Sequence, residues 1–319
     1  MRKRVYGPVM SRRYGLSLGV DPVASKSCTY DCVYCQLGPT PRTTTERAEF
    51  HPLAEVLLDV REAVARGPSP DVITVAGSGE PTLYSRLGDL ARGLAAVARV
   101  PRLLITNGSL LWREDVARDA RQFDIVAPTL TSTRESVFRG IVGPSFPASA
   151  REVVDGIESF ARSFQGRLHL EVFLVRGVND DEESLADIVA AVERIGPSRV
   201  DINTAVRPVP SRPGVEGVGY EVLERLARRL PCPASPVPAA PVARTAVPVD
   251  AAASLSGLAA RVLDTVARRP STLEDLASAL GVEPAEVGNA ADALVREGRL
   301  AESLKEQRSY YVLPTAGSN

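Results

Sequence analysis

Several residue types on which common protein functions depend are scarce in this sequence of 319 residues. It holds only two histidines, His51 and His169, which excludes zinc hydrolase sites that gather several histidines, such as H-E-x-x-H. It holds four cysteines, and no apolar stretch follows its basic start. We therefore expect neither a disulfide framework nor a secretory signal, and a reducing, cytoplasmic setting. No apolar run approaches the ~18 residues that a membrane-spanning helix requires.

Charge and aromatic content exclude further classes of function. The formal net charge is −1, so no global charge draws the chain to nucleic acid or to an anionic membrane. Only 5% of the residues are aromatic, and we therefore propose no aromatic cage for a substrate. Apolar residues, by contrast, make up 44%, which is enough to bury a sizeable core and excludes a largely disordered chain.

Helical and strand patterns alternate regularly between about residues 50 and 230. Short apolar runs predict buried strands, and stripes of apolar residues at i, i+3, i+4 and i+7 predict helices between them. The predicted strands are residues 17–20, 72–76, 103–106, 124–130, 168–174 and 200–203. Six such units predict an α/β fold with a parallel sheet, either a partial (β/α)6 TIM-like barrel or a doubly wound sheet. In both folds ligands bind at the carboxyl ends of the strands.

A proline-rich stretch separates this region from a C-terminal segment of different character. The prolines between residues 231 and 254 are incompatible with helices and central strands, which predicts an extended connector. Beyond it, three short helical patterns and a two-stranded tail are typical of a winged helix-turn-helix domain. We therefore expect a core domain at 1–230, a connector at 231–254 and a winged-helix-like domain at 255–319.

The charge of the C-terminal segment argues against duplex DNA as its partner. The net charge of residues 255–319 is −2, and the candidate recognition helix at 284–297 is acidic. A helix that enters a groove lined by phosphates is expected to be basic. We therefore expect this segment to contact a protein or peptide, or to pack against the barrel.

Three of the four cysteines lie close together, as Cys28, Cys32 and Cys35 in a C-x-x-x-C-x-x-C pattern. Three thiolates within eight residues are able to reach one metal centre. A structural zinc ion requires four closed ligands, but the remaining Cys232 lies far along the chain and is interpreted as an incidental thiol. An iron–sulfur cube held by three cysteines leaves one iron open to a small molecule. The pattern favours the cluster and leaves the zinc site open as an alternative.

The cysteine loop and two further segments resemble those of the radical S-adenosylmethionine (SAM) superfamily. The loop has an aromatic residue before its last cysteine, as that superfamily does. Ser78-Gly79-Glu80-Pro81, directly after the strand at 72–76, is similar to the family's G-G-E-P segment, with Ser in place of the first Gly. Thr106-Asn107-Gly108 resembles its T-N-G segment. Thr129-Leu130-Thr131 lies where relatives carry Ser-Leu-Asp, and Thr129 keeps a hydroxyl at the first of these positions. The resemblance covers roughly residues 5–230.

This resemblance implies two cofactors and a shared first reaction step. Cys28, Cys32 and Cys35 would hold three irons of a [4Fe–4S] cluster, and SAM would bind the fourth. An electron from a reductant such as a flavodoxin or ferredoxin would cleave SAM to methionine and a 5′-deoxyadenosyl radical, which abstracts a substrate hydrogen. The residues expected to contact the cofactors are Tyr34, Ser78, Gly79, Glu80, Thr106, Asn107, Thr129 and Asn203.

A closer likeness is to iron–sulfur oxidoreductases grouped with wyosine-type tRNA base synthases. It is carried by residues 7–13, 19–22, 175–180 and 203–208. The likeness implies a macromolecular substrate, with a tRNA base slightly ahead of a peptide or protein. The tRNA enzymes carry additional cysteines for a second cluster, which this chain lacks.

The basic amino terminus and the alternative functions remain open. Arg2, Lys3, Arg4, Arg12 and Arg13 either form a solvated arm or contact tRNA phosphates, and the last two could instead line the SAM pocket. One alternative to the enzyme is a cluster-bearing regulator that reads DNA according to redox state. The other is a zinc-stabilised scaffold without catalysis.

Overall fold

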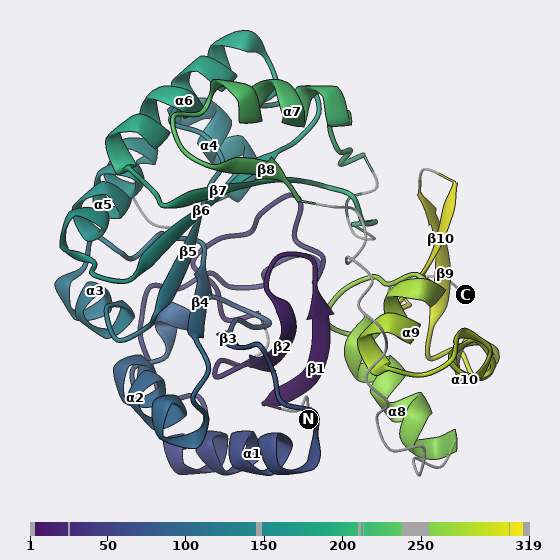
Figure 1. Ribbon diagram of the computed structural model, residues 1–319. Coiled ribbons are helices and arrows are strands. Elements are labelled where there is room, and N and C mark those ends of the chain that lie inside the picture. Colours follow the sequence, from purple (N-terminus) through teal and green to yellow (C-terminus); the bar gives the residue numbers. More distant parts are fainter. Residues whose placement is uncertain are drawn as a thin grey trace.

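The computed structural model describes residues 4–24, 26–144, 149–209, 212, 214–237, 255–305 and 307–314. Its largest element is an eight-stranded sheet whose strands follow one another in chain order (Figure 1). The strands are β1 (Val5–Ser11), β2 (Gly15–Val20), β3 (Val72–Val75), β4 (Arg102–Thr106), β5 (Ile125–Leu130), β6 (Arg167–Leu174), β7 (Arg199–Thr204) and β8 (Ala234–Pro236). β1 pairs with β2 in antiparallel fashion, and each later pair of neighbours is parallel.

The strand order decides between the two predicted folds. A doubly wound sheet reverses its order at a switch point, whereas here the order runs from β1 to β8 without reversal. In the described residues β1 pairs only with β2 and β8 only with β7, so the barrel is open between these two edges. The prediction of a partial TIM-like barrel is confirmed, and the doubly wound alternative is wrong. The six predicted strands correspond to β2–β7.

Helices cover the outer face of the sheet (Figure 1). They are α1 (Leu53–Arg66), α2 (Leu87–Val97), α3 (Glu114–Ala120), α4 (Glu135–Val142), α5 (Ala150–Ser163), α6 (Glu182–Ile195) and α7 (Tyr220–Arg229). Local sequence fixes their ends, as α6 illustrates. The carboxylate of Asp181 caps its start by accepting the Ser184 amide, and Gly196 ends it in a left-handed conformation with φ 63°.

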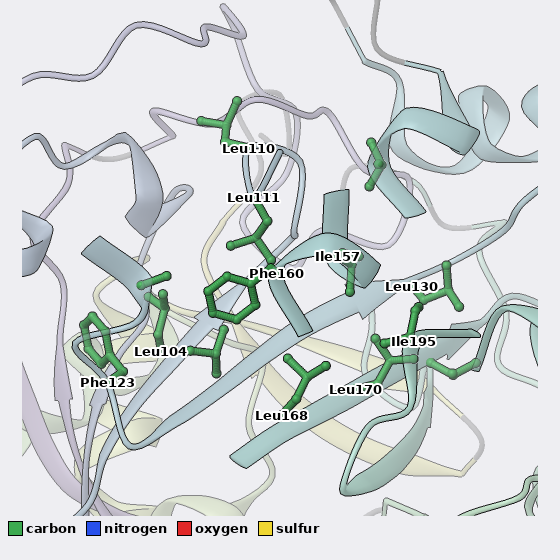
Figure 2. Packing of buried hydrophobic residues seen from close by; sticks show 14 of the residues in the cluster. Leu104, Leu110, Leu111, Phe123, Leu130, Ile157, Phe160, Leu168, Leu170 and Ile195 are labelled. Carbon is green, nitrogen blue, oxygen red and sulfur yellow. The ribbon is translucent and has the colours of Figure 1, made fainter. Parts of the chain in front are cut away.

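The main core lies between the sheet and these helices, as Figure 2 shows. Leu168 and Leu170 of β6 are buried in one cluster with Ile157 and Phe160 of α5. Fully burying such a side chain contributes about 1.5–3 kcal/mol. Successive side chains of a strand point to opposite faces of the sheet. His169, which lies between Leu168 and Leu170, therefore points into the barrel, as does every second residue of β6 counted from it.

The interior of the barrel is polar near the start of the strands. Tyr14, in the turn between β1 and β2, stacks on His169 with ring centroids 5.8 Å apart, and its hydroxyl lies 3.2 Å from His169 Nδ1. Arg13 forms an ion pair with Glu171 and lies 3.9 Å from Asp201. The β1–β2 turn therefore fills the amino-terminal end of the barrel with paired charges.

Two strands, β1 and β8, are absent from the predicted set. Gly7 and Pro8 interrupt the apolar pattern of β1, and its residues are mostly half-buried, so no alternation marks it. β8 lies within the proline-rich stretch and ends at Pro236. A proline is tolerated there because β8 is an edge strand. Residues 238–254 of the predicted connector lie outside the described residues.

The C-terminal elements enclose a hydrophobic cluster of their own. They are α8 (Leu255–Val266), α9 (Leu273–Leu280), α10 (Pro284–Arg296), β9 (Ala301–Lys305) and β10 (Arg308–Val312), at the positions that the sequence pattern predicts. Leu276, Val287 and Leu294 are fully buried in this cluster, which shares no residue with the barrel core. Among the described residues, no helix is both long enough and apolar enough to cross a membrane.

We expect His169 to remain neutral well below the pH at which histidine usually titrates. Burial, reinforced by Arg199, Arg167 and Arg13, lowers the pKa of His169 to about 4. An unfolded chain binds this proton at a pKa of about 6.5. The free energy of unfolding should therefore fall as the pH drops from about 6.5 to about 4. NMR titration measures the pKa of His169 directly. In a His51→Gln variant the remaining imidazole signal belongs to His169. A midpoint near 6.5 in the folded protein would contradict the expectation.

Candidate functional site

The three clustered cysteines lie in the loop that follows β2, at the carboxyl end of the sheet. All three are free thiols and partly exposed. Burial raises the pKa of Cys28 to about 11 and that of Cys32 well above its ordinary value, and the charges of neighbouring thiols add to both shifts. The three cysteines therefore lie close enough for their charges to interact. At Cys28 and Cys32 this environment disfavours a free thiolate and favours a group that compensates its charge.

A zinc ion would need more ligands than this loop provides. Among the described residues, no three His, Cys, Asp or Glu side chains converge closely enough to hold one metal ion. Cys232 packs against the main core and supplies no fourth ligand. A zinc ion requires four ligands at about 2.0–2.3 Å, whereas an iron–sulfur cube accepts thiolates at separate corners. The three cysteines alone therefore do not complete a tetrahedral zinc site.

Two backbone hydrogen bonds fasten the start of the cysteine loop to the end of β3. The Lys26 amide donates to the Ser78 carbonyl at 2.7 Å, and the Glu80 amide donates to the Ser27 carbonyl at 2.8 Å. Gly79 lies between these contacts, and a Cβ at this position would come within 2.0 Å of the Ser27 oxygen. Glycine is therefore required for the close approach of the two segments.

The carboxylate of Glu80 ties the end of β3 to the end of β4. It is buried and accepts hydrogen bonds from the Thr82 amide and hydroxyl, the Thr106 hydroxyl and the Asn107 amide at 2.5–3.0 Å. Its Oε1 accepts three of these four bonds, so only Oε2 keeps an acceptor site for a ligand. The side chain of Glu80 thus acts mainly as a brace between two strand ends, a role that the sequence did not indicate.

Asn107 connects the end of β4 to the cysteine loop. Its Nδ2 donates to the Thr29 hydroxyl at 2.8 Å and points to Cys28 Sγ at 3.7 Å. Thr29 in turn shares a hydrogen bond of 2.8 Å with Ser109. Five of the expected cofactor-contacting residues are therefore joined to one another and to the first cysteine: Ser78, Gly79, Glu80, Thr106 and Asn107.

The middle of the loop is fastened on its other side. The Asp31 amide donates to the Val142 carbonyl and the Val33 amide to the Ile141 carbonyl, at 2.9 and 2.8 Å, at the end of α4. Arg212, which follows β7, forms an ion pair of 2.5 Å with the Asp31 carboxylate. The loop is thus held by contacts from the ends of β3, β4 and α4 and from the segment after β7, most of which involve its backbone and not its sulfurs.

Lys26 is a site residue that the sequence pattern did not reveal. It has a left-handed backbone conformation with φ 61°. Its Nζ lies 3.3 Å from Cys35 Sγ and donates to the Gly38 carbonyl at 2.6 Å. A lysine two residues before a cysteine motif carries no general signal, because only the turn at this position brings its ammonium back to the third cysteine.

The remaining expected residues lie around the same end of the barrel. Tyr34 stacks on Phe173 of β6 with ring centroids 3.9 Å apart and an interplanar angle of 18°. Phe173 is the register partner of Asn203 on β7, which is buried, and Thr129 near the end of β5 is the partner of Glu171. Tyr34 lies in the cysteine loop, whereas Thr129 and Asn203 lie on separate strands, and no described hydrogen bond joins the three to the Ser78–Asn107 group.

The expected basic arm does not extend into solvent where the structure describes it. Arg4 forms ion pairs with Glu55 and Asp59 of α1. Arg12 and Arg13 are half-buried and line a cavity that Gly77 and Ser78 also line. Residues 1–3 lie outside the described part of the chain.

Comparison with known proteins identifies the family of the core. The family model of the Radical SAM superfamily matches residues 23–189. A UPF0026 protein of Methanocaldococcus jannaschii is 33% identical over 223 residues, a match that covers 69% of this chain and 69% of that protein. A UPF0026 protein of Helicobacter pylori is 37% identical over 208 residues, covering 64% and 67%.

A further relative, named GTPase Obg, comes from Brachyspira hyodysenteriae. It is 40% identical over 205 residues, which is 64% of this chain but only 30% of that relative's length. None of the three lysines of this chain follows a glycine, so the phosphate-binding sequence G-x-x-x-x-G-K is absent from it. The name of that relative therefore gives no ground for GTPase activity in the shared segment.

Two solved structures share the fold of the barrel. Streptococcus suis SuiB bound to S-adenosylmethionine has a TM-score of 0.52 at 13% identity, and the match covers 68% of this chain and 50% of that chain. A radical SAM methyltransferase from Sphaerobacter thermophilus has a TM-score of 0.50 at 18% identity, covering 75% and 68%. At such identities the likeness concerns the fold alone.

Substitution of Gly79 by alanine should disturb the cysteine loop selectively. The added methyl group would collide with the Ser27 carbonyl, and overpacking of this kind costs about 1–3 kcal/mol. We expect a lower melting temperature and incomplete binding of iron after anaerobic reconstitution. Gly140→Ala is the matched control, since a Cβ there meets nothing within 4 Å. Equal iron content in the two variants would contradict the assigned role of Gly79.

Removal of the Lys26 charge should make the cluster harder to reduce. A cation and hydrogen-bond donor beside a ligand sulfur favours the reduced, more negative state. We expect Lys26→Met to shift the midpoint potential to a more negative value, and Lys26→Arg to lie closer to the wild type. Both replacements keep a Cβ, so backbone strain is matched. A potential that is equal in wild type and Lys26→Met would show that the contact with Cys35 has no electrostatic effect.

Proposed function

This chain belongs to the radical SAM superfamily, and from that membership we propose that it is an enzyme that binds a [4Fe–4S] cluster on Cys28, Cys32 and Cys35 and uses SAM to modify a macromolecular substrate. The superfamily uses these two cofactors, and when bound they supply a 5′-deoxyadenosyl radical that abstracts a hydrogen atom. One observation carries the proposal. The cysteine loop is hydrogen-bonded to the Ser78–Glu80 and Thr106–Asn107 segments at the carboxyl end of the barrel.

The residues of this chain have distinct roles in the proposed site. The three thiolates hold the cluster, and the donors Lys26 and Asn107 stabilise the negative charge on Cys35 and Cys28. Gly79 permits the approach of the loop to the strand that carries the SAM-binding segment. The free acceptor of Glu80, the Thr129 hydroxyl and the Asn203 amide provide polar groups for SAM around the rim.

Asp21 supports the SAM-binding segment from below. Its Oδ2 accepts hydrogen bonds from the Ser78 amide and hydroxyl at 3.0 and 2.9 Å. Gly77 makes room for it, because a Cβ at Gly77 would lie 1.9 Å from Asp21 Oδ1. Asp21 is therefore a positioning residue for Ser78, and its own side chain is buried away from the rim.

For the substrate we favour a tRNA base over a peptide. The likeness to wyosine-type synthases supports RNA, and so do the half-buried arginines Arg12 and Arg269, which line a cavity beside the sheet. A peptide is the second candidate, because SuiB, whose fold is similar, has been solved with the precursor peptide SuiA. A flavodoxin or ferredoxin is the proposed source of electrons.

A redox-responsive DNA-binding role has less support. The exposed residues of α10 include Glu286 and Asp292, which would repel phosphates. Lys305 of the hairpin β9–β10, a position from which a wing would touch DNA, donates instead to carbonyls of the barrel. We propose that residues 255–312 form a winged-helix fold used for packing against the barrel.

Formation of 5′-deoxyadenosine tests the enzyme assignment. Anaerobically reconstituted and reduced protein should convert SAM to 5′-deoxyadenosine and methionine. Cys32→Ala should bind less iron and form no product, whereas Cys232→Ala should match the wild type because Cys232 packs only against the core. Chromatography with mass detection measures the product. The proposal would be refuted if a folded, fully iron-loaded preparation formed no 5′-deoxyadenosine and if zinc filled the site in cells.

The choice of substrate is tested on the same preparation. Bulk tRNA lacking the modification should accelerate formation of 5′-deoxyadenosine severalfold and acquire a new base detectable by nucleoside mass spectrometry. Peptide mixtures serve as the comparison. Acceleration by peptides and not by tRNA would reverse the order of the two substrate classes.

A further inference from the structure

The C-terminal elements close the open side of the barrel. In Figure 1 they lie beside the gap between β1 and β8. On one edge, α9 packs against β1. On the other, Lys305 Nζ donates to the carbonyls of Ala205, Arg207 and Val215 at 2.6, 3.2 and 3.2 Å, after the end of β7. The C-terminal elements thus bridge both edges of the gap.

Buried side chains strengthen this contact. Arg207 after β7 and Asp275 of α9 form an ion pair of 3.1 Å, and both side chains are almost fully buried. Arg268, which follows α8, lies 3.2 Å from Asp21 and 4.0 Å from the ring centroid of Tyr6 on β1. Because Asp21 also holds Ser78, Arg268 is connected to the proposed SAM-binding segment through one carboxylate.

A cavity of about 350 Å³ lies between these two parts of the protein. Such a volume is at the lower end of the range for small-molecule sites. One wall includes Gly77 and Ser78 at the end of β3, and another includes Arg12, Arg268 and Arg269. We call it the arginine cavity. A group held by its arginines would lie beside the proposed position of SAM.

One arginine of the arginine cavity, Arg269, differs from its neighbours in its ion pairs. Arg13 is paired with Glu171 and Arg268 with Asp21. Arg269 forms no ion pair among the described residues, and its Nη2 is buried without a hydrogen-bond partner there. Burial of a charge is costly, and Asp275, the acid whose charge acts on Arg269, is already paired with Arg207, so Arg269 favours an anionic ligand.

The shifts of the arginine pKa values agree with that geometry. Burial, together with the charge of Arg207, lowers the pKa of Arg12 to about 9 and that of Arg269 to about 10. Arg12, Arg207 and Arg269 are therefore close enough to repel one another. An anion placed among them would relieve this repulsion and interact with several guanidinium groups at once.

We propose that the arginine cavity, completed by the C-terminal elements, binds the phosphate of a nucleotide unit of the substrate, with Arg269 and Arg12 as its ligands. A phosphate group carries more negative charge and more acceptor oxygens than a carboxylate, and it is therefore better suited to several guanidinium groups at once. The small volume holds a single nucleotide and not a folded RNA. Assigning the phosphate to the substrate rests on the proposed function, but phosphate binding itself does not.

Titration of the holoenzyme with inorganic phosphate, adenosine 5′-monophosphate and adenosine tests the proposal. By calorimetry in the presence of SAM, we expect the two phosphate compounds to bind and adenosine to bind at least tenfold more weakly. Arg269→Gln should weaken phosphate binding at least tenfold, and Arg269→Lys should weaken it less. Arg299→Gln is the control, since Arg299 is exposed and pairs only with Glu297 in the described structure. Equal phosphate affinity in wild type and Arg269→Gln, or no binding by the wild type, would overturn the proposal.

Thermal unfolding separates a ligand-binding role from a structural one. In phosphate-free buffer Arg269→Gln should melt at the same temperature as the wild type or higher, because an uncompensated charge is removed, and phosphate should raise only the wild-type melting temperature. A variant that melts lower in both buffers would indicate a structural arginine. If Arg269→Gln lost affinity for SAM, and if SAM prevented phosphate from binding to the wild type, Arg269 would instead be assigned to the carboxylate of SAM.

Two further measurements separate this proposal from the proposed function. Cys32→Ala, which lacks the cluster, should still bind phosphate if the arginine cavity is a phosphate site, and loss of that binding would count against the site. If the wild type binds phosphate through Arg269 but never forms 5′-deoxyadenosine, the enzyme assignment is refuted and the phosphate site is not. Bulk tRNA that competes with phosphate would identify a polynucleotide source, and competition by a free mononucleotide alone would identify a small-molecule substrate.

Discussion

The site depends on the close contact between the cysteine loop and the end of β3. Two backbone hydrogen bonds on either side of Gly79 join Lys26 and Ser27 to Ser78 and Glu80, and the absence of a side chain at Gly79 permits them. The Glu80 carboxylate extends this contact to β4 through Thr106 and Asn107. The cysteine loop, the Ser78–Glu80 segment and Thr106–Asn107 are consequently parts of one hydrogen-bonded unit at the carboxyl end of a parallel barrel, where this fold binds its ligands.

The C-terminal elements change the character of that barrel. A partial barrel has an open side, and here α9 and the β9–β10 hairpin cover it while contacting both edges. The covering elements bring arginines to the cavity, so the charge of the interior depends on residues from both ends of the chain. This arrangement gives the C-terminal segment a role in the barrel that its acidic surface does not suggest. It also explains why Asp21, Ser78 and Arg268, which are far apart in sequence, form one chain of contacts.

The regular parts of the fold could be predicted because their sequences carry a strong period. The apolar runs of β3 and β6 correspond closely to the predicted ranges, and helices follow these strands as the alternating pattern predicts. β1 and β8 were missed because glycine and proline interrupt them and because their edge positions need no continuous apolar pattern. The cysteine loop and the Ser78–Glu80 segment were recognised from local motifs. The contact of Lys26 with Cys35 and the meeting of Arg12 with Arg269 depend on turns and on tertiary packing, which no local pattern encodes.

The central claim is that three cysteines hold an iron–sulfur cluster whose remaining iron binds SAM. Electron paramagnetic resonance of the reduced, anaerobic holoprotein, recorded with and without SAM, tests it most directly. The claim predicts a cluster signal whose g-values change when SAM is added, because the ligand binds at the open iron. A fully loaded cluster whose spectrum is identical with and without SAM would contradict it.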